Sequence, residues 1–158
     1  MQGNLQAPCG YDKWSFGYRD IAGSKVHNRV RDDKYGSAYG PGDIIGCFLH
    51  LDDQDPENNQ MRFFKNGVDQ GIAFQGREIE NGVYFPAVSL YKQVTLCRIL
   101  RGTLTKLHQA SVTVNFGPSF ILRHDIYGAN AISELQPLSP EERKVILFCL
   151  YLSSHQKY

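Results

Sequence analysis

The sequence contains no long hydrophobic run and almost no net charge. No apolar stretch reaches the roughly 18 residues of a membrane-spanning helix, and polar residues follow Met1. The formal net charge of +1 is too small to indicate nucleic-acid binding by itself. We therefore expect no membrane span, no secretory signal and no direct nucleic-acid contact from this segment.

Closely spaced metal-binding cysteines are also missing. Cys9, Cys47, Cys97 and Cys149 are far apart in the chain, without a Cys-x-x-Cys pair, and there is no Asn-x-Ser/Thr sequon. This pattern favours four free thiols in a reducing compartment, with no bound metal or cofactor. An acidic stretch over 52–59 offers oxygen ligands but lacks the spacing of a calcium loop, so a polar hairpin loop is the favoured interpretation.

Motifs of the common catalytic sites are absent too. The sequence has no Gly-x-Ser-x-Gly elbow, no His-Glu-x-x-His pair and no phosphate-binding Gly-x-x-x-x-Gly-Lys loop. Its histidines never lie three to five residues apart, the spacing of many zinc-finger pairs. No catalytic residue is predicted, and a binding protein is favoured over an enzyme.

Short β-strand patterns separated by turns are what the sequence does contain. Strand-like runs cover 43–51, 61–65, 68–74 and 82–90, and aromatic residues alternate at Trp14, Phe16 and Tyr18. Asn66-Gly67 supplies the positive φ angles of a two-residue type I′ turn. With 158 residues, 42% of them hydrophobic, the chain is predicted to form one all-β domain with a single core.

The last part of the chain predicts a short C-terminal helix. Ser139 stands as N-cap, Pro140 at the first helical position and Glu142 three residues after the cap. The residues from 145 onward are apolar on nearly all sides, unlike those of a surface helix. A short, adhesive helix and a translated intron beginning at Val145 are the two interpretations of this tail.

Four motifs together resemble the SPRY domain. They are Gly-Asp-Ile-Ile-Gly-Cys at 42–47, Phe-Phe-Lys-Asn-Gly-Val at 63–68, Tyr-Phe-Pro-Ala-Val-Ser-Leu at 84–90 and Val-Asn-Phe-Gly at 114–117. Gly-Asn-Leu-Gln-Ala-Pro-x-Gly-Tyr-Asp-Lys at 3–13 is similar to the Ash2 family, subunits of complexes that methylate lysine 4 of histone H3, and the match extends to about residue 120. The resemblance implies a bent antiparallel β-sandwich of the concanavalin-like class.

The same resemblance implies a non-catalytic nuclear adaptor. In the Ash2 family one surface of the sandwich binds an acidic segment of the WD-repeat subunit RbBP5, and the pair holds a SET-domain methyltransferase in its active arrangement. The matching positions here are Pro8, Tyr11 and Arg19. One departure predicts weaker binding: Ile21 replaces the family's lysine, with Asp20 beside it.

Other departures concern the ends and the middle of the chain. The family's upstream strands and its PHD-like and winged-helix modules are missing, so we expect an N-terminally incomplete SPRY domain of marginal stability. Residues 94–109 interrupt the family pattern, as a surface-loop insertion or a retained intron. The tail shows no motif for a Dpy-30-like subunit, which leaves that partner doubtful. The predicted boundaries are a partial SPRY domain over 1–122, followed by a linker and helix over 123–158.

Two other functional classes stay open at this point. SPRY domains also serve as substrate receptors of ubiquitin ligases, although the sequence shows no SOCS box or RING. A carbohydrate-binding β-sandwich is the second alternative, which a glycan array would distinguish.

Overall fold

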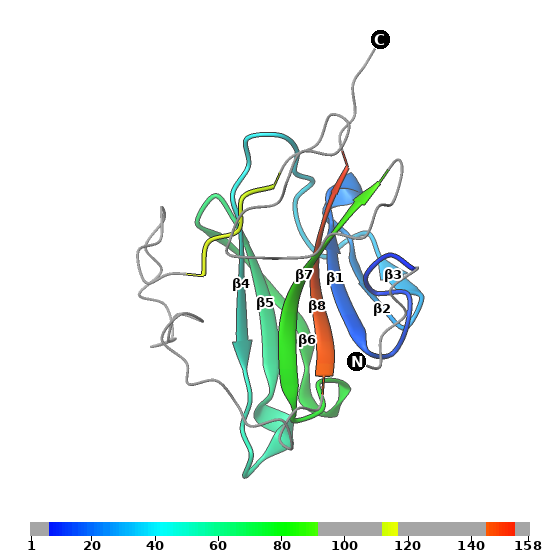
Figure 1. Cartoon of the computed structure of the whole chain (residues 1–158). Coiled ribbons are helices and arrows are strands. Elements are labelled where there is room, and N and C mark those ends of the chain that lie inside the picture. The colour runs from blue at the N-terminus through cyan, green and yellow to red at the C-terminus, as the bar shows by residue number, and fades with distance from the viewer. Residues whose placement is uncertain (1–6, 92–111, 117–144, 154–158) are drawn as a thin grey trace.

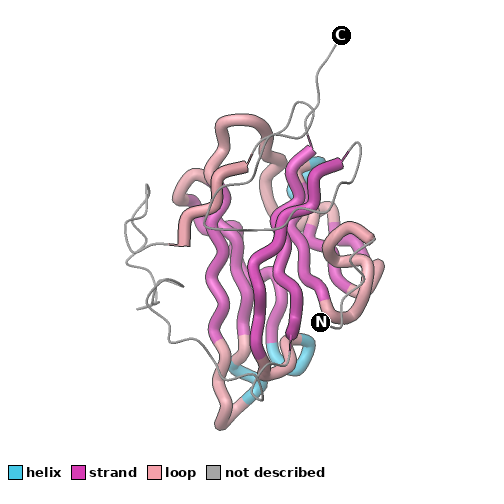
Figure 2. Tube along the Cα trace, in the orientation of Figure 1, coloured by secondary structure: helices cyan, strands magenta, loops and turns pink. Residues whose placement is uncertain are grey.

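Two β-sheets form the described part of the molecule. The computed structural model describes residues 7–91, 112–116 and 145–153, and its strands are arranged in two layers (Figures 1 and 2). One sheet has the order β3-β2-β1-β8-β7, formed by Val30–Asp32, Lys25–His27, Ser15–Arg19, Val145–Ser153 and Val83–Tyr91. The other has the order β4-β5-β6, formed by Ile45–His50, Gln60–Lys65 and Val68–Gln75. The predicted β-sandwich is confirmed.

The three-stranded sheet follows the sequence patterns closely. Its strands pair antiparallel, and the β5–β6 hairpin closes with Lys65 opposite Val68. Asn66 has φ of 49° and Gly67 has φ of 88°, as the predicted type I′ turn requires. Within the described residues, the helices are single turns of 3₁₀ type, at Ile21–Gly23, Pro56–Asn58 and Gly76–Glu78. No helix in these ranges has the length and hydropathy to cross a membrane.

The C-terminal prediction was wrong for the residues that the structure describes. Val145–Ser153 is strand β8, which pairs parallel with β1 on one side and with β7 on the other. A continuous apolar run rich in β-branched and aromatic residues is typical of a central parallel strand, and periodicity alone does not distinguish it from a buried helix. The capping residues at 139–142 lie outside the described residues, as do 94–109 and 123–144.

Aromatic side chains from both sheets form the core. Phe16 and Tyr18 project from β1, and their rings lie 4.9 Å from Phe74 and 5.1 Å from Phe63 between ring centroids. Each of these four residues is at most 3% exposed. The Tyr18 hydroxyl donates to the Ser37 carbonyl at 2.6 Å, and burial raises the pKa of Tyr18 to about 12. The predicted alternation is therefore confirmed at Phe16 and Tyr18, whereas Trp14 precedes the strand.

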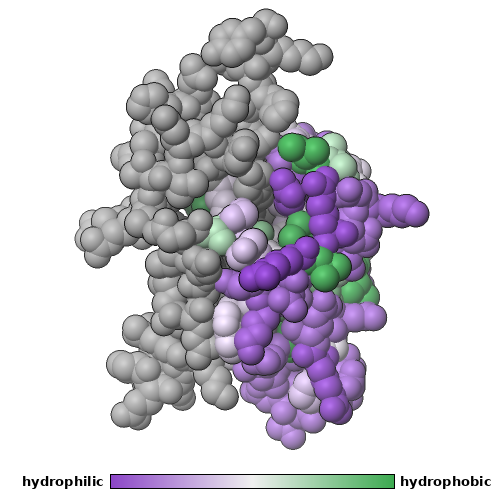
Figure 3. Space-filling view, turned by 90° about the vertical axis from the view of Figure 1, so that its right-hand side faces the viewer, coloured by the Kyte–Doolittle hydropathy of each residue, from purple (hydrophilic) through white to green (hydrophobic). Residues whose placement is uncertain are grey.

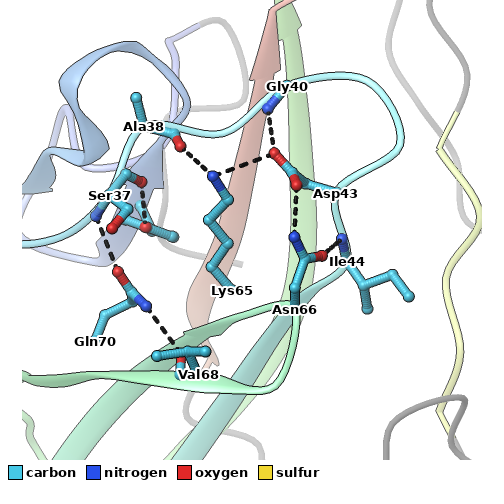
Figure 4. A network of polar contacts seen from close by, with 10 residues as sticks. Ser37, Ala38, Gly40, Asp43, Ile44, Lys65, Asn66, Val68 and Gln70 are labelled. Atoms are coloured by element: carbon cyan, nitrogen blue, oxygen red, sulfur yellow. Dashed lines mark hydrogen bonds and ion pairs between the residues drawn. The ribbon is translucent and has the colours of Figure 1, made fainter.

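A polar network fastens the loop before β4 to the β5–β6 hairpin (Figure 4). Asn66 donates through Nδ2 to Asp43 at 2.6 Å and accepts from the Ile44 N–H at 2.8 Å. The Lys65 ammonium donates to the Ala38 carbonyl at 2.6 Å and lies 3.5 Å from an Asp43 oxygen. The turn residue Asn66 thus supplies both the backbone conformation of the hairpin and its attachment to the neighbouring loop.

The structure also describes the 52–59 loop and residues 112–116. In the 52–59 loop, the Asp52 carboxylate accepts the backbone N–H groups of Gln54 and Asp55 at 2.9 and 3.0 Å, so it organises the loop as a turn. Residues 112–116, which include most of the Val-Asn-Phe-Gly motif, contain an isolated bridge residue, Thr113. The place beside β7 within the sheet is occupied by β8.

Candidate partner-binding surface

The N-terminal loop lies against the outward face of β1. The Gly10 N–H donates to the Ser15 hydroxyl at 2.9 Å, and a Cβ at Gly17 would lie 3.1 Å from the Cys9 carbonyl oxygen. Gly10 has φ of +84°, and a Cβ there would lie 2.5 Å from the Val26 carbonyl oxygen. Glycine at these two positions therefore allows the loop to approach the sheet closely.

This loop also contacts the turn between β2 and β3. The Arg29 N–H donates to the Gly10 carbonyl at 2.9 Å, and the Asn28 N–H donates to the Asp12 carbonyl at 3.2 Å. The Arg29 guanidinium carbon consequently lies 4.6 Å from the centroid of the Tyr11 ring, within cation–π range. Tyr11 remains 41% exposed, and its N–H donates to the carbonyl of the exposed Pro8 at 3.1 Å.

Arg19 lies at the opposite end of β1. Its backbone N–H donates to the Ser24 carbonyl at 2.8 Å, and the residue is half-buried. Nearby, hydrogen bonds from Ser24 and Arg31 hold the pKa of the Asp33 carboxyl below its usual range, with a smaller contribution from the positive charge of Arg19. Arg31 and Asp33 form an ion pair between partly exposed side chains.

Strand register places these cations on one face of the sheet. Gly17 pairs with Val26, and Val26 pairs with Arg31, so all three lie on the same face. Arg19 lies two residues from Gly17 in the same strand, which puts it on that face as well. Arg29, in the turn before β3, lies beside this face through its contacts with Gly10 and Tyr11 of the N-terminal loop. We call this surface of β1–β3, which bears Arg19, Arg29 and Arg31, the arginine face.

The structure brings together only part of the predicted site. Pro8 and Tyr11 lie at one end of β1, beside Arg29, while Arg19 lies at the other end, near Asp33. A strand rises by about 3.3 Å per residue, so the length of β1 separates the two ends by roughly 13 Å. A small ligand does not reach both ends, whereas an extended peptide does.

The sequence motifs pointed to neither Arg29 nor Arg31 as a candidate site residue. Their shared face depends on the two-residue turn at Asn28-Arg29, where both residues have positive φ, of 47° and 67°. An asparagine at the first turn position was the available signal, but the arginine after it concealed the type I′ pattern.

Asp20 and Ile21, the two residues after Arg19 that differ from the family pattern, lie in different environments. Ile21, in place of the expected lysine, is 45% exposed and offers no charge. Asp20 is only 5% exposed, so its carboxylate contributes little to the surface that an approaching anion meets. Figure 3 shows the side of the molecule on which β3 lies: hydrophilic residues dominate its described surface, and hydrophobic residues are scattered between them.

The chemistry available in the described ranges is that of anion recognition. Guanidinium groups offer planar pairs of N–H donors that match carboxylates, and Tyr11 offers a rigid ring with a hydroxyl. Within residues 7–91, 112–116 and 145–153, no three His, Cys, Asp or Glu residues gather closely enough to hold a metal ion. The surface is suited to an extended acidic segment.

Cys9 corrects the expectation of four free thiols. It is disulfide-bonded and only 7% exposed, whereas Cys47 is a free cysteine. The Cys9 sulfur also lies 3.2 Å from the Ser89 hydroxyl oxygen of β7. Because a disulfide sulfur carries no hydrogen, the serine hydroxyl is the donor in this contact.

Comparison with known proteins identifies relatives of this chain. The chain is 28% identical over 196 aligned residues to the Set1/Ash2 histone methyltransferase complex subunit ASH2 of Drosophila melanogaster, covering 97% of this chain. It is 38% identical over 91 residues to the Drosophila ATP-dependent RNA helicase Ddx1, and 37% identical over 81 residues to the Drosophila Ran-binding proteins 9/10 homolog. These matches cover 57% and 51% of this chain.

The relatives are much longer than the segment they share with this chain. The matches span 31%, 11% and 8% of the ASH2, Ddx1 and Ran-binding relatives respectively. What the three relatives have in common with the chain is therefore one module and not a whole-protein activity. The sequence profile of the SPRY domain matches residues 1–103, and together with the two-sheet architecture it shows that the chain belongs to the SPRY domain family.

Proposed function

We propose that this SPRY domain is a non-catalytic interaction module of a nuclear complex that methylates lysine 4 of histone H3. The similarity to the ASH2 subunit over 97% of the chain supports this assignment. The proposed partner is an acidic segment of an RbBP5-like WD-repeat subunit, bound in extended form along the arginine face.

The observation that carries the proposal is the alignment of cations along one face, next to an exposed aromatic ring. Arg29 and Tyr11 would engage one end of the acidic segment, and Arg19 the other, with Pro8 shaping the loop that carries Tyr11. Arg31 is already paired with Asp33, so a partner carboxylate would compete with that aspartate. Ionic contacts at partly exposed sites contribute modestly, and the affinity would rest on several of them together.

The module would act on methylation through binding alone. Together with the WD-repeat subunit it would favour the active arrangement of a SET-domain methyltransferase, provided that the assembled pair binds this arrangement more tightly than the inactive one. The difference between the two binding free energies would set the largest possible shift of the equilibrium toward the active arrangement. No side chain of this chain would contact the methyl donor.

The proposed surface is tested by measuring the affinity of the chain for a fluorescent Glu/Asp-rich peptide from the WD-repeat subunit, by fluorescence anisotropy. We expect Arg19→Ala to weaken its affinity about 3- to 10-fold, because a charge-assisted contact is lost, and Arg19→Lys to weaken it less. Arg77→Ala is the matched control: Arg77 is 82% exposed and pairs with Glu57, away from the arginine face. Equal affinities for the wild type and Arg19→Ala would remove Arg19 from the proposed site.

Residues 94–109 are proposed to be dispensable for this interaction, as an insertion in the family pattern. A chain lacking them should bind the same peptide with unchanged affinity, since the arginine face is built from β1–β3. A loss of binding without loss of folding, judged by circular dichroism, would show that the segment belongs to the site.

A further inference from the structure

A carboxylate of the chain itself already lies on the arginine face. Asp33 follows β3, and its Oδ1 atom accepts hydrogen bonds from the Ser24 hydroxyl at 2.5 Å and from Arg31 Nε. The side chains of Arg31 and Asp33 are 36% and 55% exposed, so their ion pair is open to solvent and to an approaching partner. Asp33 therefore occupies a position in which the acidic segment would place one of its own carboxylates.

A second cation of the same face also acts on this carboxylate. Hydrogen bonds from Ser24 and Arg31 are the main reason that the pKa of Asp33 lies below its ordinary value, and the positive charge of Arg19 adds a smaller contribution. While Asp33 is in place, its negative charge offsets part of the field that Arg19 and Arg31 present to an external acid. The carboxylate thus weakens the face at the end where Arg19 lies.

Release of Asp33 would leave its two hydrogen-bond donors with partners. The Ser24 hydroxyl has one hydrogen but two acceptors within reach, the Asp33 carboxylate and, at 3.0 Å, the Ile21 carbonyl. Arg31 Nε also lies 3.2 Å from the Ser24 oxygen, which accepts its hydrogen bond. Because Ser24 is fully buried, a hydroxyl without an acceptor would be costly, and the Ile21 carbonyl prevents this. The contact of Asp33 with Ser24 and Arg31 is therefore built to open.

We propose that Asp33 is an internal competitor of the acidic segment and limits the affinity of the arginine face for it. This inference rests on the proposed function, because it concerns the same surface and the same ligand. Exchange of one carboxylate for another at Arg31 gives little net gain in binding free energy. A partner segment must therefore supply further carboxylates for Arg19 and Arg29, so Asp33 makes the face select segments with several acidic residues.

The competition is tested by measuring the affinity of the full chain for the fluorescent Glu/Asp-rich peptide at about 150 mM salt, where long-range repulsion is screened. Asp33→Asn keeps the size of the side chain and its oxygen acceptor but removes its charge, so it should raise the affinity about 2- to 5-fold. Asp32→Asn is the matched control. It changes the net charge equally, one residue away, on the opposite face of β3, where Asp32 is in register with Lys25. This control should bind like the wild type.

Two further variants separate competition from a general effect of charge. Ser24→Ala removes a hydrogen bond to Asp33 without any change in charge, so it should also raise the affinity, by a smaller factor than Asp33→Asn. It tests the proposal as well if circular dichroism shows that Asp33→Asn does not fold. In an Arg31→Ala background the competitor has lost its arginine, so Asp33→Asn should change the affinity by less than about twofold.

Two results would overturn the competition, and a third would contradict the proposed function. Equal affinities for Asp33→Asn and Asp32→Asn would remove the special role of Asp33 while the wild type still binds the peptide. A gain from Asp33→Asn that is as large without Arg31 as with it would mean that Asp33 acts by simple repulsion. Absence of binding by both the wild type and Asp33→Asn would contradict recognition of acidic segments and, with it, the role of Asp33.

Discussion

At the scale of single residues, Arg29 is in a conformation that its side chain disfavours. Its φ of 67° lies in the left-handed region, which costs a residue with a Cβ about 1 kcal/mol. In return the guanidinium is held over the Tyr11 ring at the tip of the β2–β3 turn. Disfavoured conformations that persist are often found where function requires them, and the proposed site gives Arg29 such a role.

Substitution of Arg29 separates stability from binding. Arg29→Ala and Arg29→Gly both remove the guanidinium, so each should lower the affinity for the acidic peptide about 3- to 10-fold. Only glycine relieves the left-handed strain, so Arg29→Gly should have an unfolding free energy about 1 kcal/mol higher than Arg29→Ala in urea denaturation. If both variants bound the peptide like the wild type, Arg29 would have no part in recognition.

The individual residues of the site were only partly predictable. Tyr11 and Arg19 were found through a family resemblance, which indicates the sequence positions of site residues but not the distances between them. Their separation along β1 and the presence of Arg29 and Arg31 on the same face follow from strand register and from a turn with two positive φ angles. Register is a tertiary property, so a single sequence does not specify it here.

At the scale of elements, local turn chemistry was more informative than hydrophobic periodicity. Asn66-Gly67 predicted its hairpin correctly because the two residues alone determine the turn. The apolar run at 145–153 was assigned to a helix because the capping pattern before it is a local signal, while its strand conformation is stabilised by distant partners in β1 and β7. Elements whose partners are far away in the chain are the ones that sequence patterns misassign.

The attachment of the loop before β4 to the β5–β6 hairpin should make stability depend on acid pH. The Asn66 side chain, the Gly40 N–H and Lys65 hold the pKa of Asp43 below its ordinary value of 3.8. A depressed pKa in the folded state means that the ionised carboxylate stabilises the fold above about pH 4, and that this contribution is lost as the pH falls through the folded-state pKa. Melting temperature should therefore fall on acidification below pH 4.

The contribution of Asp43 is isolated by comparing variants between pH 7 and pH 3. Asp43→Asn should melt at a lower temperature than the wild type at pH 7, and the difference should narrow at pH 3. Asp53→Asn, an exposed substitution in the 52–59 loop, is the control and should follow the wild type. A constant difference between Asp43→Asn and wild type across this range would show that ionisation of Asp43 does not stabilise the fold.

At the scale of the whole molecule, the two faces of the five-stranded sheet have different roles. Phe16 and Tyr18 on one face pack against the second sheet and supply the core. The opposite face is covered by the N-terminal loop in its centre and presents arginines along β1–β3. Alternation along a strand assigns successive residues of β1 to these two tasks, so core and binding surface depend on the same register.

The salt dependence of peptide affinity tests the central claim most directly. The affinity of the acidic peptide is measured at salt concentrations between about 50 and 300 mM. Over this range the Debye length falls from roughly 14 to 6 Å, so contacts between partly exposed charges are screened more strongly. The arginine face predicts that affinity for the wild type falls about tenfold over this range and that Arg19→Ala with Arg29→Gly flattens the dependence. Salt-independent binding by the wild type, or an unchanged slope in the double variant, would contradict recognition through this face.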